Sequence, residues 1–151
     1  MKASLSPALH YVRHAMPRVT LRKAVERSKS KNYLTVAQSF YAGAELAKEF
    51  EYWNASGVLI VHAAIAYADA ITIKLGGLKC QGENHHEAIA LVETFVVQDQ
   101  AARKALNQLR SILDEKTAVS YSDEVYERKD VEKMWKFLDR YRHWALDVLA
   151  E

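Results

Sequence analysis

The chain has 151 residues, half of them hydrophobic, with five Gly, two Pro and one Cys. This length is that of one domain, and the scarcity of Gly and Pro favours an all-α fold over a strand-rich one. A single cysteine excludes an internal disulfide framework, and the N-terminus lacks the apolar core of a signal peptide, so we expect a cytoplasmic protein.

The net charge of +2 is unevenly distributed along the chain. Residues 1–31 carry eight basic groups and one acidic group, Glu26, which gives a charge of +7. The other 120 residues carry 13 basic and 18 acidic groups, a charge of −5. We therefore predict a basic N-terminal extension, residues 1–31, and a helical domain, residues 32–151. The extension has three open roles: a strap lying on an acidic surface of its own or a partner subunit, a nucleic-acid-binding arm, or an organelle-targeting presequence.

Two short helices are predicted inside the extension, over residues 8–16 and 19–28. His10 and His14 are four residues apart, which is the spacing of two zinc ligands on one helix face. The sequence offers no third ligand near them. We interpret them as surface or packing histidines and predict no metal site.

The first helix of the domain is predicted from Asn32, its N-cap, to about Tyr52. Its predicted apolar stripe consists of Leu34, Ala37, Tyr41, Ala44 and Phe50, with Leu46 and Ala47 beside it. Residues 53–57 are the predicted turn, in which Asn54 or Ser56 caps the next helix. The turn is short, so the two helices should form an antiparallel hairpin.

The second helix, residues 58–75 (VLIVHAAIAYADAITIKL), is apolar on nearly every side. A helix of this kind must be covered all round, so we expect it at the centre of a bundle, with one face covered by a second subunit. His62, Asp69 and Lys74 interrupt it, which disfavours a membrane span. Gly76 and Gly77 supply its C-terminal end.

Three more helices are predicted after a loop that ends at Gly82. Asn84 caps a helix that runs through Phe95, and a second helix covers residues 101–114. Six residues of that second helix should face inward: Ala102, Ala105, Leu106, Leu109, Ile112 and Leu113. Residues 115–122 are a predicted loop, and a last helix runs from a cap at Asp130 to about Ala150. No strand is predicted.

This order of elements resembles the HEPN superfamily of small helical bundles. The resemblance rests on four segments: YLTVAQSFYAGAELAKEF, AAIAYADAITIKLGG, GENHHEAIALVE and DEKTAVSYSDEVYERKDVEKMWKFLDRYRHWA. It covers about residues 32–150 and implies an antiparallel up-and-down bundle of four to five helices that forms a homodimer. Members of the family are metal-independent ribonucleases and toxins, often paired with a small nucleotidyltransferase, or non-catalytic binding modules.

The family's ribonucleases share an Arg followed by a His at the start of the last long helix. No Arg in this chain has a His at that spacing, and Arg140 is too close to His143. Segment 116–121, KTAVSY, stands at the equivalent place. A lysine binds phosphate only as a point charge, and a tyrosine with a pKa near ~10 is a poor general base at neutral pH. The resemblance therefore implies a non-catalytic module.

We expect this module to bind RNA, a nucleotide, or a protein partner such as a small nucleotidyltransferase, without a cofactor and without a membrane. The candidate ligand-binding residues are Lys74, Lys79, Lys116, Ser120, Tyr121 and Tyr126. The alternative is a divergent ribonuclease or toxin with a replaced catalytic pair. Its candidate residues are Lys116, His85, His86 and Tyr121.

Overall fold

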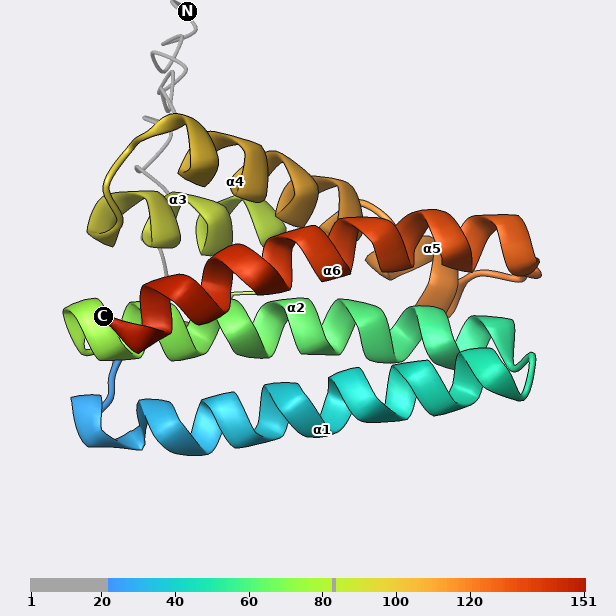
Figure 1. Cartoon of the computed structure of the whole chain (residues 1–151), viewed down its shortest axis with the longest axis horizontal. Helices are drawn as coiled ribbons and strands as arrows, with labels where there is room; N and C mark the ends of the chain where they lie inside the picture. The colour runs from blue at the N-terminus through green and yellow to red at the C-terminus, as the bar shows by residue number, and fades with distance from the viewer. Residues whose placement is uncertain (1–21, 83) are drawn as a thin grey trace, which may run out of the picture.

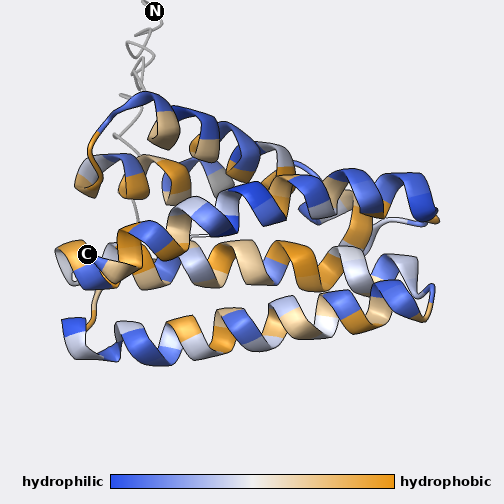
Figure 2. Cartoon of the chain, in the orientation of Figure 1, coloured by the Kyte–Doolittle hydropathy of each residue, from blue (hydrophilic) through white to orange (hydrophobic). Residues whose placement is uncertain are grey.

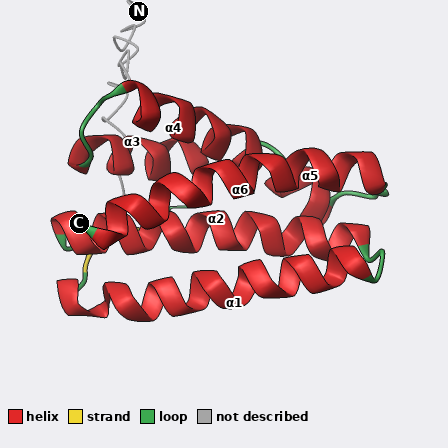
Figure 3. Ribbon diagram, viewed as in Figure 1, coloured by secondary structure: helices red, strands yellow, loops and turns green. Residues whose placement is uncertain are grey.

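The computed structural model describes residues 22–82 and 84–151, apart from the side chain of His85. This part of the chain is mostly helical, with two short strands and one 3-10 turn (Figure 3). The α-helices are α1 (Ser30–Glu49), α2 (Trp53–Gly76), α3 (His85–Phe95), α4 (Gln100–Leu113), α5 (Lys116–Tyr121) and α6 (Arg128–Ala150). The strands are β1 (Arg22–Ala24) and β2 (Leu78–Cys80), and the 3-10 turn is η1 (Arg27–Lys29).

Helix α2 lies at the centre of the bundle, as its composition predicts. It contacts α1 along its length and is also covered by α6, α3, α4 and α5 (Figures 1 and 2). By length and composition α2 could span a membrane, but most of its apolar stretch is buried inside the bundle. The chain itself covers most of this helix. The prediction that a second subunit covers one of its faces stays a prediction.

The core contains the six residues of α4 predicted to face inward, all of them buried. Helix α6 adds Val131, Met134, Leu138, Tyr141 and Ala145. The hairpin of α1 and α2 is antiparallel, as predicted. Strict up-and-down alternation breaks at the next step, because α2 and α3 run in the same direction (Figure 1). The backbone makes its return between them in β2 instead of in a helix.

The N-terminal end of α2 differs from the sequence expectation, whereas its C-terminal end agrees with it. Residues 53–57 belong to α2, and the turn consists of Phe50 to Tyr52, with Glu51 in the left-handed region at φ 60°. The predicted caps have other roles: Asn54 pairs with the backbone of Glu124 and Tyr126, and Ser56 donates to a carbonyl of α1. At the other end, Gly77 has φ 63°, which confirms the predicted glycine termination.

Among the other predicted helix N-caps, that of α3 is confirmed and those of α1 and α6 are wrong. Asn84 caps α3 by accepting from the backbone N–H of His86, as predicted. Helix α1 begins at Ser30, directly after η1, so Asn32 is not its cap. Helix α6 begins at Arg128, with Glu127 as N-cap and Asp130 completing a reciprocal capping box.

Two predicted loops contain regular structure. Residues 116–121 form α5, because the buried Val119 packs against Gly57 of α2. Residues 78–80 form β2, which pairs antiparallel with β1, so the expectation of no strand is wrong. Residues 22–31, from the basic N-terminal segment, thus provide β1, η1 and the start of α1. The histidines at positions 10 and 14 lie outside the described residues.

Candidate functional site

The predicted site residues lie at separate places in the fold. Lys116, Ser120 and Tyr121 belong to α5, at the N-terminal end of α2, where a Cβ atom on Gly57 would be 2.6 Å from Val119. Lys74 lies near the C-terminal end of α2, about 26 Å from Gly57 by helix rise, and Lys79 lies beside Asp69, about 18 Å from Gly57. His86 is at the start of α3. The structure therefore does not gather these residues into one site.

The α5 end contains one buried and one exposed tyrosine. Tyr126 is 3% exposed, and its hydroxyl donates to the Glu115 carboxylate. Burial, and then this hydrogen bond, raise the pKa of Tyr126 well above its ordinary value, so it stays protonated. Tyr121 is 79% exposed. Tyr126 thus joins α5 to the segment before α6, and only Tyr121 offers its ring to a ligand.

Lys74 acts as a cap for the last helix. Its Nζ donates to the backbone carbonyl of Leu149 and, at 2.8 Å, to that of Glu151. These carbonyls lie at the C-terminal end of α6, where the helix leaves acceptors unpaired and where the dipole favours a cation. Lys74 therefore has a structural partner on the chain itself.

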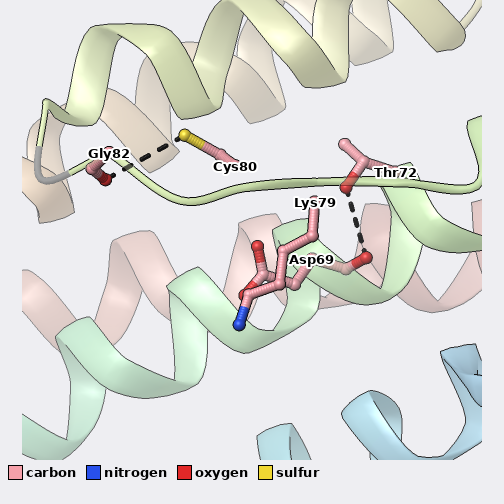
Figure 4. Close-up of polar contacts among 5 residues, drawn as sticks. All are labelled: Asp69, Thr72, Lys79, Cys80 and Gly82. Carbon is pink, nitrogen blue, oxygen red and sulfur yellow. Dashed lines mark hydrogen bonds and ion pairs between the residues drawn. The ribbon is translucent and has the colours of Figure 1, made fainter. Parts of the chain in front are cut away.

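Lys79 faces a buried carboxylate. Asp69, on α2, is only 8% exposed, and its Oδ2 lies 3.9 Å from Nζ of Lys79 on β2 (Figure 4). Burial raises the pKa of Asp69 to about 7, although the Lys79 ammonium opposes this shift. The same ammonium lies 5.1 Å from the centre of the Tyr33 ring on α1. Lys79 thus links β2 to two helices.

Two further lysines lie beside this contact. Lys23 is directly opposite Lys79 in the β1–β2 ladder, and directly opposed residues point to the same face of a sheet. Lys29, the last residue of η1, precedes Tyr33 on α1 by four residues. We call Lys23, Lys29 and Lys79 the lysine cluster, in which Lys79 lies beside the Tyr33 ring. Sequence reasoning identified Lys79 but missed Asp69 as its partner.

A groove between α1 and α6 is a second concave feature. It has a volume of about 500 Å³. Its lining residues are Tyr41, Glu45, Lys48, Glu49, Glu51, Trp53, Arg128, Glu132 and Trp135. Both tryptophans already have a cation over the ring: Arg128 lies 5.1 Å from the centre of Trp53 and Lys48 lies 5.4 Å from that of Trp135. These contacts bridge α1, α2 and α6. Sequence reasoning missed the groove because its residues come from three distant segments.

Among the side chains that the structure describes, which exclude that of His85, no three of His, Cys, Asp or Glu come close enough together to bind a metal ion. The free thiol of Cys80, on β2, is half-buried and lies within hydrogen-bonding distance of the Gly82 carbonyl (Figure 4). Comparisons of the chain with protein-family models, with curated proteins and with solved structures found no match.

Proposed function

We propose that this chain is a non-catalytic helical binding module of the HEPN type, which works in the cytoplasm as a homodimer and binds an anionic ligand, RNA or a nucleotide. The order of its helices and the central position of α2 support the resemblance. The dimer proposal rests on an apolar stripe on the outside of α1. The alternative ligand of the module is a protein partner, such as a small nucleotidyltransferase.

The stripe consists of large apolar side chains that the chain leaves in solvent. Val36, Leu46 and Phe50 are 45%, 55% and 62% exposed, and Tyr52 after the helix is 64% exposed. Part of the stripe is a shallow apolar groove of about 360 Å³ that includes Gly43. Contiguous exposed apolar surface of this kind is a feature of interaction sites.

The spacing of the stripe fits a second copy of the same helix. Val36 and Phe50 are each seven residues, two helical turns, from Gly43. Two α1 helices crossing antiparallel at Gly43 would therefore place Val36 of each copy beside Phe50 of the other. Such self-complementarity is what a two-fold interface requires, and Gly43 lets the two backbones approach closely.

The dimer is tested by light scattering on the eluting protein. We expect the wild-type chain to have twice its chain mass and Leu46→Glu to be monomeric, with an unchanged far-UV circular dichroism spectrum. Val97→Glu is the matched control, because Val97 is 80% exposed on the α3–α4 connection and lies outside the stripe. A monomeric wild-type protein, or equal effects of the two substitutions, would rule the interface out.

The ribonuclease alternative is tested with purified protein and total RNA in the presence of EDTA. Lys116 lies on α5, which packs on α2, whereas His86 begins α3, which packs on α2, α4 and β2. The position of these two residues on different elements favours a non-catalytic module. Cleavage that survives EDTA and disappears in Lys116→Ala would overturn the non-catalytic assignment.

A further inference from the structure

The lysine cluster places positive charge beside an aromatic ring. Lys79 lies 5.1 Å from the centre of the Tyr33 ring, Lys23 faces Lys79 across the ribbon, and Lys29, the last residue of η1, is four residues before Tyr33. Like charges directly opposed on a sheet repel each other. The cluster therefore carries an energetic cost that a bound anion would remove.

The lysines differ in the partners they have. Within 4 Å, and among the described residues, Lys79 pairs with Asp69, whereas the ion pairs include neither Lys23 nor Lys29. Both are exposed, and so are the neighbouring Arg22, Arg27 and Lys31. Among the described residues, Lys23 and Lys29 are therefore exposed cations outside any ion pair, whereas Lys79 is half-buried and paired with the buried Asp69.

The contact between Lys79 and Asp69 is a loose one. The separation of 3.9 Å is longer than a hydrogen bond, and 31% of the Lys79 side chain is exposed. A lysine is a point charge on a flexible stem, so its ammonium group can turn toward solvent without moving the strand. Asp69, at 8% exposure on the rigid central helix, has no such freedom.

We propose that Lys23, Lys29 and Lys79 bind a phosphodiester backbone, and that Lys79 exchanges its internal partner, Asp69, for the ligand's phosphate. This inference names the anion site of the proposed module and rests on that function. Lys23 and Lys29 supply fixed charges at the rim. The ring of Tyr33 offers a face on which a base can stack, as in other single-strand binding surfaces.

The exchange couples ligand binding to a proton. When Lys79 leaves Asp69, the buried carboxylate loses the charge that favours its ionised form, and it takes up one proton from solvent. The groups that face Asp69 are Lys79 from β2 and, from α6, the buried hydroxyl of Tyr141, which stays neutral because burial raises its pKa. Since the pKa of Asp69 is about 7, affinity for the anion should increase as pH falls through neutrality.

The test uses the full chain and a fluorescein-labelled single-stranded oligoribonucleotide of about 12 nucleotides, a length within the usual range of single-strand sites. Anisotropy gives the Kd at about pH 6 and pH 8 at constant ionic strength. We expect the wild-type protein to bind about five- to tenfold more tightly at the lower pH, as proton linkage requires. Asp69→Asn should bind the oligoribonucleotide tightly at both pH values, because in this variant Lys79 has no ion pair with a carboxylate to break.

The control variants distinguish binding by the lysine cluster from binding by positive charge elsewhere on the protein. Lys79→Met should bind weakly, with a smaller difference in affinity between the two pH values. If this variant fails to fold, Asp69→Asn/Lys79→Met, which removes both charges of the buried pair, is used in its place and should show the same weak binding. Lys136→Met, an exposed lysine of α6, is the matched control and should behave as the wild-type protein. Wild type and Asp69→Asn differ in a single titratable group, so the contribution of the others cancels in the comparison.

The outcomes distinguish this site from the dimer. An equal pH effect in wild type and Asp69→Asn, or unchanged binding by Lys79→Met, would overturn the exchange. Equal competition by inorganic phosphate or by oligoglutamate of matched charge would overturn the phosphodiester assignment. Loss of binding with the dimer intact counts against this site alone. A monomer that binds with the expected pH dependence counts against the α1 interface alone.

Discussion

Asp69→Asn should change how the stability of the protein depends on pH. Burial raises the pKa of Asp69 from 3.8 to about 7 in the folded state, so the folded protein holds this proton more tightly than the unfolded chain. The stability that Asp69 contributes is therefore fully present below pH 3.8 and is lost as pH rises through about 7. At ~1.4 kcal/mol per pH unit, the rise of this pKa from 3.8 to about 7 corresponds to a contribution of roughly 4 kcal/mol to the free energy of unfolding.

Part of this pH-dependent contribution falls in a pH range in which unfolding can be measured. Between about pH 5 and pH 8, the free energy of unfolding of the wild type should fall by roughly 2–3 kcal/mol relative to that of Asp69→Asn. Little discount for solvent screening applies, because Asp69 is only 8% exposed. Other titrating groups are common to both proteins and cancel in the difference.

The assay is urea unfolding followed by circular dichroism at four pH values, with ionic strength and protein concentration held constant. Fixed concentration matters because a dimer's stability depends on it. A difference between the two proteins that stays constant within about 0.5 kcal/mol over this range would refute the reasoning, since a buried carboxylate with a raised pKa must produce a slope.

Two further predictions concern packing at the two ends of α2. Gly57→Ala should cost about 1–3 kcal/mol in urea unfolding, because its Cβ would lie 2.6 Å from Val119, and Val119→Ala should relieve much of that cost in the double variant. In the Leu46→Glu background, which removes the proposed dimer contact, Gly43→Ala is the matched control and should be neutral or slightly stabilising, since its Cβ would be 3.4 Å from the nearest side chain of the same chain. Lys74→Met should speed hydrogen exchange in the last turn of α6 and cost about 1 kcal/mol or less, because the carbonyl of Leu149 loses its donor. Unchanged exchange there would show that the cap is not formed in solution.

Much of the fold could be predicted because it depends on local pattern. The inward face of α4 has a regular helical spacing, and all six predicted residues are buried. Asn84 caps α3, and Gly77 ends α2 in a left-handed conformation, as residue type alone indicates. These features need only neighbours along the chain.

Most of the errors come from contact between distant segments, and one comes from the shortness of an element. Residues 116–121 look like a polar loop, but burial of Val119 against α2 makes them helical. Asn54 and Ser56 look like caps, but their side chains bond to Tyr126 and to the carbonyl of Ala44. The β1–β2 ribbon has only three residues in each strand, too few for an alternating pattern to be recognised.

By itself, the sequence determined the helical class, the central place of α2 and the uneven charge, because composition and helical periodicity are properties of the chain alone. Only the tertiary structure decided which charges meet. Lys79 is one of many lysines until the fold places it between Asp69, Tyr33 and Lys23. A carboxylate acquires an unusual pKa only from the burial and the neighbours that folding provides.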